Sequence, residues 1–199
     1  MLRHRRDSEC YPMEDEKLLP FIIRSKLHRP QIHRDYLHRQ QLLNQLDQRS
    51  RRQFSLISAP AGYGKTTLAS SWLETTGTPY AWVSLDVSDN DLRLFLSYIL
   101  TAIQTIFPDS GRQTLAMVNA SKLAPVAALA GSLINEIDQI EESFILALDD
   151  FHLIKDKSVI EMILQVLRHP QPSMHLVLIG RRDPAIPNSR LRAKRLMTE

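Results

Sequence analysis

Two kinds of hydrophobic pattern alternate along the chain. Short runs in which nearly every residue is apolar predict strands that are buried on both faces of a sheet. Longer stretches with apolar residues at every third or fourth position predict helices. The predicted strands cover residues 54–58, 80–85, 144–148 and 175–179. The helical spacing is found from Leu37 to Leu46 and over residues 65–75, 92–103, 125–140 and 159–167.

This alternation of buried strands and helices predicts an α/β fold with a mostly parallel sheet covered by helices on both faces. In a sheet with an inserted central strand, the strand at 175–179 would lie between the first and third strands. Residues 1–19 mix charges with a proline and show no apolar period, so we expect a flexible tail there. Residues 20–199 are long enough to form one domain.

A glycine-bearing loop joins the first predicted strand to the helix at 65–75. Residues 59–67 read Ala-Pro-Ala-Gly-Tyr-Gly-Lys-Thr-Thr, which differs from the usual G-x-x-x-x-G-K-[ST] phosphate loop at Ala59. Such a loop wraps backbone N–H groups around phosphate at a helix start and adds a lysine and a hydroxyl for Mg²⁺. The alternative is a lysine that begins an ordinary helix; the preceding strand and following helix favour ATP with Mg²⁺. The candidate contacts are Gly62, Gly64, Lys65, Thr66 and Thr67.

Two carboxylates follow the strand at 144–148. The carboxyl ends of parallel strands are where open α/β sheets bind ligands. We expect Asp149 to join Thr66 in holding the metal, and Asp150 to orient or deprotonate an attacking water. Two acids in a solvated loop are the alternative, which the phosphate loop upstream makes weaker.

Arg181 follows the strand at 175–179. If that strand is central, Arg181 points toward the terminal phosphate and can sense it or stabilise its charge. A surface arginine in a basic loop with Arg182 is an alternative of nearly equal weight.

Composition and charge restrict the function classes. The chain is 43% hydrophobic and 24% charged, as in ordinary globular proteins. Much of the net charge of +3 lies at the two ends, in residues 3–6 and 181–195, whereas a DNA-binding domain concentrates its cations on one face. Cys10 is the single cysteine, and no stretch reaches the roughly 18 apolar residues of a membrane span. We expect a soluble, cytoplasmic protein without disulfides.

With these motifs, the chain from about Ile23 onward resembles the MalT-like, LuxR-class large ATP-dependent transcriptional activators, which belong to the STAND group of signal-transduction ATPases. Ala59 is usual in that family. The resemblance implies that Arg39 lies near the adenine, although Gln41 occupies the next matching position in place of the family's arginine. The matching segments are 24–27 with Pro30, 59–67, 81–86, 89–91 with Phe95, 148–152, Arg181, Asp183-Pro184, Pro187 and 190–192.

The resemblance implies a regulatory switch domain, of the NB-ARC or AAA type, that binds ATP or ADP and hydrolyses ATP slowly. A stand-alone P-loop ATPase or kinase-like enzyme and a nucleic-acid binder are the alternatives. The family's winged-helix, helical-repeat sensor and helix-turn-helix domains have no counterpart in these 199 residues, so we expect a truncated form without specific DNA binding. We also expect the final core strand to be missing beyond Leu196, which would leave the edge at 54–58 open to self-association.

Overall fold

A parallel sheet organises the computed structural model, which describes residues 22–32, 39–49, 53–183 and 197–198. The tail predicted for residues 1–19 lies outside these ranges. The strand order is β2-β3-β4-β1-β5, and every pair of neighbours is parallel. The prediction of an α/β fold with a mostly parallel sheet is therefore confirmed, and the condition that the fourth strand lies between the first and third is met. The strands are β1 (Phe54–Ser58), β2 (Tyr80–Ser84), β3 (Phe144–Asp149), β4 (Met174–Gly180) and β5 (Met197–Thr198).

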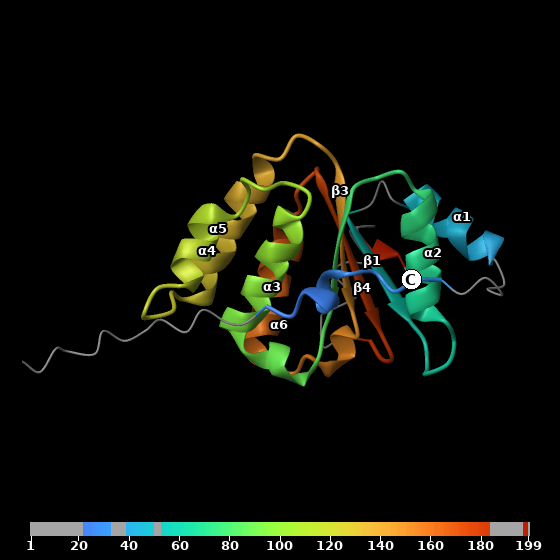
Figure 1. Cartoon of the computed structure of the whole chain (residues 1–199), viewed down its shortest axis with the longest axis horizontal. Helices are drawn as coiled ribbons and strands as arrows, with labels where there is room; N and C mark the ends of the chain where they lie inside the picture. Colours follow the sequence, from blue (N-terminus) through green and yellow to red (C-terminus); the bar gives the residue numbers. More distant parts are fainter. Residues whose placement is uncertain (1–21, 33–38, 50–52, 184–196, 199) are drawn as a thin grey trace, which may run out of the picture.

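Helices cover both faces of the sheet (Figure 1). One face packs against α1 and α2, and the other packs against α3 to α6. Alternate strand residues serve the two faces: Leu146 of β3 joins the core of the larger layer, and its neighbours Ile145 and Ala147 join that of the smaller. The helices are α1 (Gln40–Arg49), α2 (Lys65–Thr75), α3 (Leu92–Gln104), α4 (Arg112–Val118), α5 (Val126–Asp138) and α6 (Lys157–Arg168). None of the helices described is long and apolar enough to cross a membrane.

The expectation of a missing final strand is wrong at the start of β1. Residues Met197 and Thr198 form β5, which pairs in parallel with Phe54 and Ser55. Since the ladder partners of Phe54 and Ser55 come from the same chain, the argument for self-association through an open edge is weakened.

An N-terminal segment, residues 22–32, ties the two helical layers together (Figure 1). It contains the short 3-10 helix η1 (Arg24–Leu27). Within it, Lys26 is buried, and its Nζ lies 2.6 Å from Oδ2 of the fully buried Asp89 and 4.2 Å from the ring centre of Tyr98 on α3. Further along, Arg29 donates to the carbonyl oxygen of Ser70 on α2. The segment thus contacts one helix from each layer.

Replacing Lys26 with methionine should destabilise the fold, because the carboxylate of Asp89 would stay buried without its cation. Breaking a buried pair in this way costs about 3 kcal/mol of unfolding free energy. Urea denaturation measures the change, and Lys122→Met, at an exposed lysine, is the control. If Lys26→Met lowers the unfolding free energy no more than the control does, the buried pair does not stabilise the fold.

Candidate functional site

The predicted phosphate loop connects β1 to the first turn of α2. Gly62 and Gly64 have φ angles of 83° and 71°, in the left-handed region where a side chain is strained. Gly64 is the N-cap of α2, so no side chain caps this helix. A helix start without a capping side chain offers its first N–H groups to an external acceptor, and its dipole favours an anion.

Lys65 lies folded back over this loop. Its Nζ donates to the carbonyl oxygen of Pro60 at 3.0 Å, and the side chain is partly exposed. A neutral carbonyl is a weaker partner for an ammonium than a phosphate oxygen. Lys65 is therefore positioned beside the helix start that favours anions. Thr67 follows on the same turn and is half-buried.

Thr66 and Asp149 meet although they lie in different elements. The Oγ1 of Thr66, on the first turn of α2, donates to Oδ2 of Asp149, at the end of β3, over 2.9 Å. Asp149 is only 4% exposed. Burial raises the pKa of its carboxyl, and the bonds from Thr66 and the backbone N–H of Asp150 oppose that rise. The structure thus places together the two residues predicted to hold a metal.

Asp150 begins the β3–α6 loop, residues 150–156, in an unusual conformation. Among the described residues it is the one non-glycine residue with positive φ, at 54°. Its side chain is 44% exposed, and Oδ1 lies 3.7 Å from Nδ1 of His152. The 3-10 helix η3 (Phe151–Leu153) follows directly. The carboxylate is therefore accessible to water beside the buried Asp149.

His152 lies beside Asp150, and the sequence analysis gave it no role. Its Nδ1 is buried and has no hydrogen-bond partner within the described part of the chain. Burial lowers the pKa of His152, and the positive charges of Arg181 and Lys65 lower it further, whereas Asp150 raises it. The available signal was its position two residues after Asp150, because a tight turn returns that side chain toward the carboxylate.

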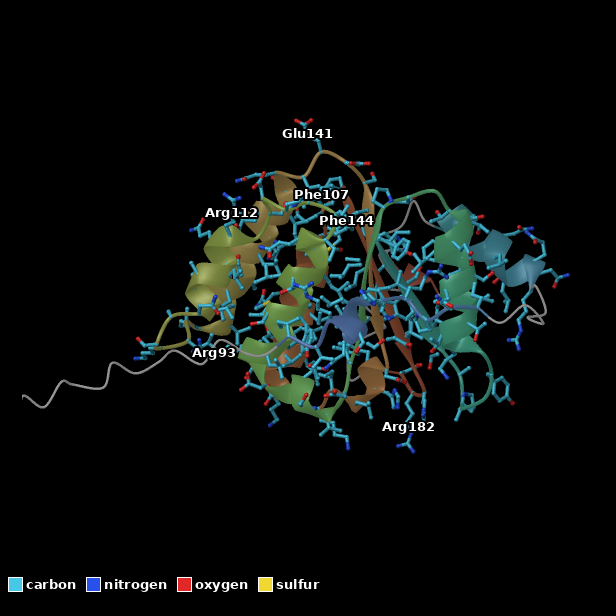
Figure 2. The ribbon with its side chains drawn as sticks, viewed as in Figure 1. Arg93, Phe107, Arg112, Glu141, Phe144 and Arg182 are labelled. Atoms are coloured by element: carbon cyan, nitrogen blue, oxygen red, sulfur yellow. The ribbon has the colours of Figure 1, made fainter. Side chains whose placement is uncertain are left out.

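Arg181 and Arg182 follow β4 and are exposed. Figure 2 shows Arg182 at the opposite end of the sheet from Glu141, which precedes β3. Asp149 ends β3, whereas Lys65 and Arg181 follow the carboxyl ends of β1 and β4. All three therefore lie at the same end of the sheet as Arg182. Arg181 is close enough to influence the charge state of His152, and no contact of its side chain with Asp149 or Asp150 is described.

A mostly apolar pocket of about 180 Å³ opens beside the loop. At its rim Nη1 of Arg39 donates to the carbonyl oxygen of Tyr63 at 2.9 Å, while Gln41 is exposed on α1. A pocket of this kind suits a flat base next to an anion site. Apolar and aromatic lining comes from Leu42, Leu46, Leu56, Ile57, Tyr63 and Leu68.

The raised pKa of Asp149 predicts that Asp149→Asn stabilises the nucleotide-free chain at neutral pH. The folded state holds the carboxyl proton to a higher pH than the unfolded chain, so wild-type stability falls as pH rises through that window. An amide still serves both partners, since its oxygen accepts from the Asp150 N–H and the Thr66 hydroxyl can accept from its NH₂.

The stability gained in Asp149→Asn should vanish below pH 3.8, the ordinary pKa of an aspartate carboxyl. There the carboxyl of the wild-type chain is protonated in both the folded and the unfolded state. Urea unfolding over a pH series measures it, and Asp138→Asn, at an exposed aspartate of α5, is the control. An Asp149→Asn chain that is less stable at pH 7 would contradict the burial cost assigned to this carboxyl.

Comparison with known proteins supports the motifs. No protein-family model matches the chain. The HTH-type transcriptional regulator MalT of Klebsiella pneumoniae subsp. pneumoniae is 33% identical over 178 residues, and MalT of Cronobacter sakazakii has the same identity over the same length. MalT of Yersinia pestis is 32% identical over 178 residues. These alignments cover 89% of this chain and 20% of each regulator, so the chain spans about a fifth of its relatives' length.

The fold has a counterpart of known structure. Cdc6p from Pyrobaculum aerophilum superimposes with a TM-score of 0.52 and 16% sequence identity, covering 88% of this chain and 48% of Cdc6p. At this identity the likeness concerns the fold alone. Together with the loop at residues 59–67, the similarity to the regulators confirms the resemblance seen in the sequence: the chain is similar to a segment of MalT, and its α/β fold is like that of Cdc6p.

Proposed function

We propose that this chain is an ATP-binding regulatory switch domain that binds ATP with Mg²⁺ and hydrolyses it slowly. The observation that carries the proposal is the 2.9 Å bond between Thr66 and the buried Asp149, beside an uncapped helix start and Lys65. This arrangement would combine an anion site with a hydroxyl and a carboxylate that can hold a cation, at one end of the sheet.

The residues present fit Mg²⁺ and a triphosphate. Mg²⁺ prefers oxygen ligands and is often held by one or two carboxylates together with substrate phosphates. Thr66 supplies a hydroxyl and Asp149 a carboxylate. Burying the carboxylate without a cation costs free energy. The loop containing Gly62 and Gly64 would hold the phosphates, and the pocket beside Arg39 would hold the base.

Bound Mg²⁺ would supply positive charge that neutralises the phosphates. Lys65 would exchange the carbonyl of Pro60 for phosphate oxygens. Asp150, exposed beside this pair, would accept a proton from water, and His152 would help to orient that water. Arg181 would stabilise the terminal phosphate from the end of β4.

The similarity to transcriptional regulators favours a switch over the stand-alone ATPase or kinase-like enzyme that the sequence also allowed. In that role the bound nucleotide sets a conformational state, which the sensor and helix-turn-helix domains expected in full-length relatives would read in the cytoplasm. The chain alone would not recognise a DNA sequence, because the apolar faces of α3, α5 and α6 pack against the sheet and are not free to enter a groove.

Removing the loop lysine should weaken ATP-Mg²⁺ binding at least about 10-fold, because charge-assisted hydrogen bonds contribute about 1.5–3 kcal/mol. Calorimetric titration of Lys65→Ala measures the loss, with circular dichroism to establish that the fold is intact. Lys122→Ala, at an exposed lysine between α4 and α5, is the matched control. Equal ATP affinity in Lys65→Ala and wild type would refute the assignment of the loop.

A further inference from the structure

Asn90 links two loops at the carboxyl end of the sheet. It ends the 3-10 helix η2 (Val87–Asn90), and its Nδ2 donates to the carbonyl oxygens of Val87 at 3.0 Å and Leu153 at 3.1 Å. Its Oδ1 accepts from the backbone N–H groups of Lys155 at 2.6 Å and Asp156 at 2.8 Å. An amide has two donor hydrogens and two acceptor lone pairs, so these bonds use its full capacity.

Three of these bonds hold the β3–α6 loop, in which Asp150 has its left-handed conformation. Left-handed backbone costs free energy at a non-glycine residue and persists only when the surroundings restrain it. On the N-terminal side, Oδ1 of Asp149 accepts from the N–H of Asp150 at 2.9 Å. On the C-terminal side, the side chain of Asn90 holds Leu153, Lys155 and Asp156. The conformation of Asp150 is thus restrained from both directions.

The turn that carries Asn90 is itself firmly held. Asp86 and Asp89 form a reciprocal capping box around η2. Lys26, from the N-terminal segment, lies 3.2 Å from the carboxylate of Asp86 and 2.6 Å from that of Asp89. A side chain on a turn fixed in this way can transmit restraint to the loop that it bonds.

We propose that Asn90 is a positioning residue for ATP hydrolysis, which holds the β3–α6 loop so that Asp150 and His152 stay at the nucleotide site. The inference rests on the proposed function and adds a residue that acts through the loop. None of the bonds of the Asn90 side chain reaches residues 59–67 in the described chain. Its loss should therefore lower turnover and leave nucleotide affinity almost unchanged.

The experiment compares Asn90→Ala, Asn90→Asp and Asn119→Ala with the wild-type chain. Asn90→Ala removes all the bonds of the side chain, whereas Asn90→Asp keeps the acceptor for Lys155 and Asp156 and loses both donors. Asn90→Asp has nearly the same shape as the wild-type side chain, so it can still test the proposal if the alanine variant folds poorly. Asn119→Ala is the control, at the asparagine that follows α4 as its C-cap. Asp150→Asn defines the turnover expected when the carboxylate is lost.

Three measurements are needed. In nucleotide-free protein, hydrogen–deuterium exchange over residues 150–156 should be about 10-fold faster in Asn90→Ala and intermediate in Asn90→Asp. Calorimetry should give ATP-Mg²⁺ affinities within about twofold of wild type for both. Phosphate release should fall about 10-fold in Asn90→Ala and less in Asn90→Asp. The control should match wild type throughout.

Unchanged exchange in Asn90→Ala would overturn the restraint, and faster exchange with wild-type turnover would overturn the positioning role. Equal losses of affinity and turnover would indicate a general structural role and also overturn it. Wild-type protein that binds ATP without any turnover would remove the hydrolysis that the inference needs. Wild-type protein that fails to bind ATP would contradict the proposed function itself, and the exchange measurement would still decide whether Asn90 restrains the loop.

Discussion

The hydrogen bond from Thr66 to Asp149 is the contact on which the candidate site depends. It joins the first turn of α2 to the end of β3, and β4 lies between β3 and β1 in the sheet. Because all strands of the sheet are parallel, the loop after β1 and the carboxylates at the end of β3 lie at the same edge of the sheet. The carboxyl of Asp149 is buried at some cost, as its raised pKa shows. The fold thus loses stability at the position where we propose that a cation binds.

In the proposed function, one loop binds the nucleotide and a different loop carries the groups for hydrolysis. The loop at residues 59–67, with Arg39 beside it, presents groups suited to binding phosphates and a base. The β3–α6 loop presents Asp150 and His152, and it is held mainly by contacts to Asn90 and by its buried Phe151 and Ile154. A switch benefits from this division, because affinity for the nucleotide and the lifetime of the ATP state can be set separately.

The sequence predicted those parts of the fold whose pattern is local. The strands, the longer helices and the glycine loop each carry their signal in consecutive residues. The central place of β4 was only a condition in the sequence analysis, and the sheet order meets it. The sequence did not predict α4, because its N-terminus is stabilised by Glu136 of α5, which accepts from the N–H groups of Gln113 and Thr114. The same holds for β5 and for the bonds of Asn90, which depend on contacts between residues far apart in the chain.

The central claim is that one site binds both phosphates and a divalent cation: residues 59–67 bind the phosphates, and Thr66 of that loop holds the cation together with Asp149. A crystal structure with a non-hydrolysable ATP analogue and Mn²⁺ in place of Mg²⁺ tests it most directly, since anomalous scattering locates the manganese. The account predicts a manganese peak beside Thr66 and Asp149, with the phosphates on the loop and the base in the pocket next to Arg39. A nucleotide bound elsewhere, or manganese remote from both side chains, would contradict it.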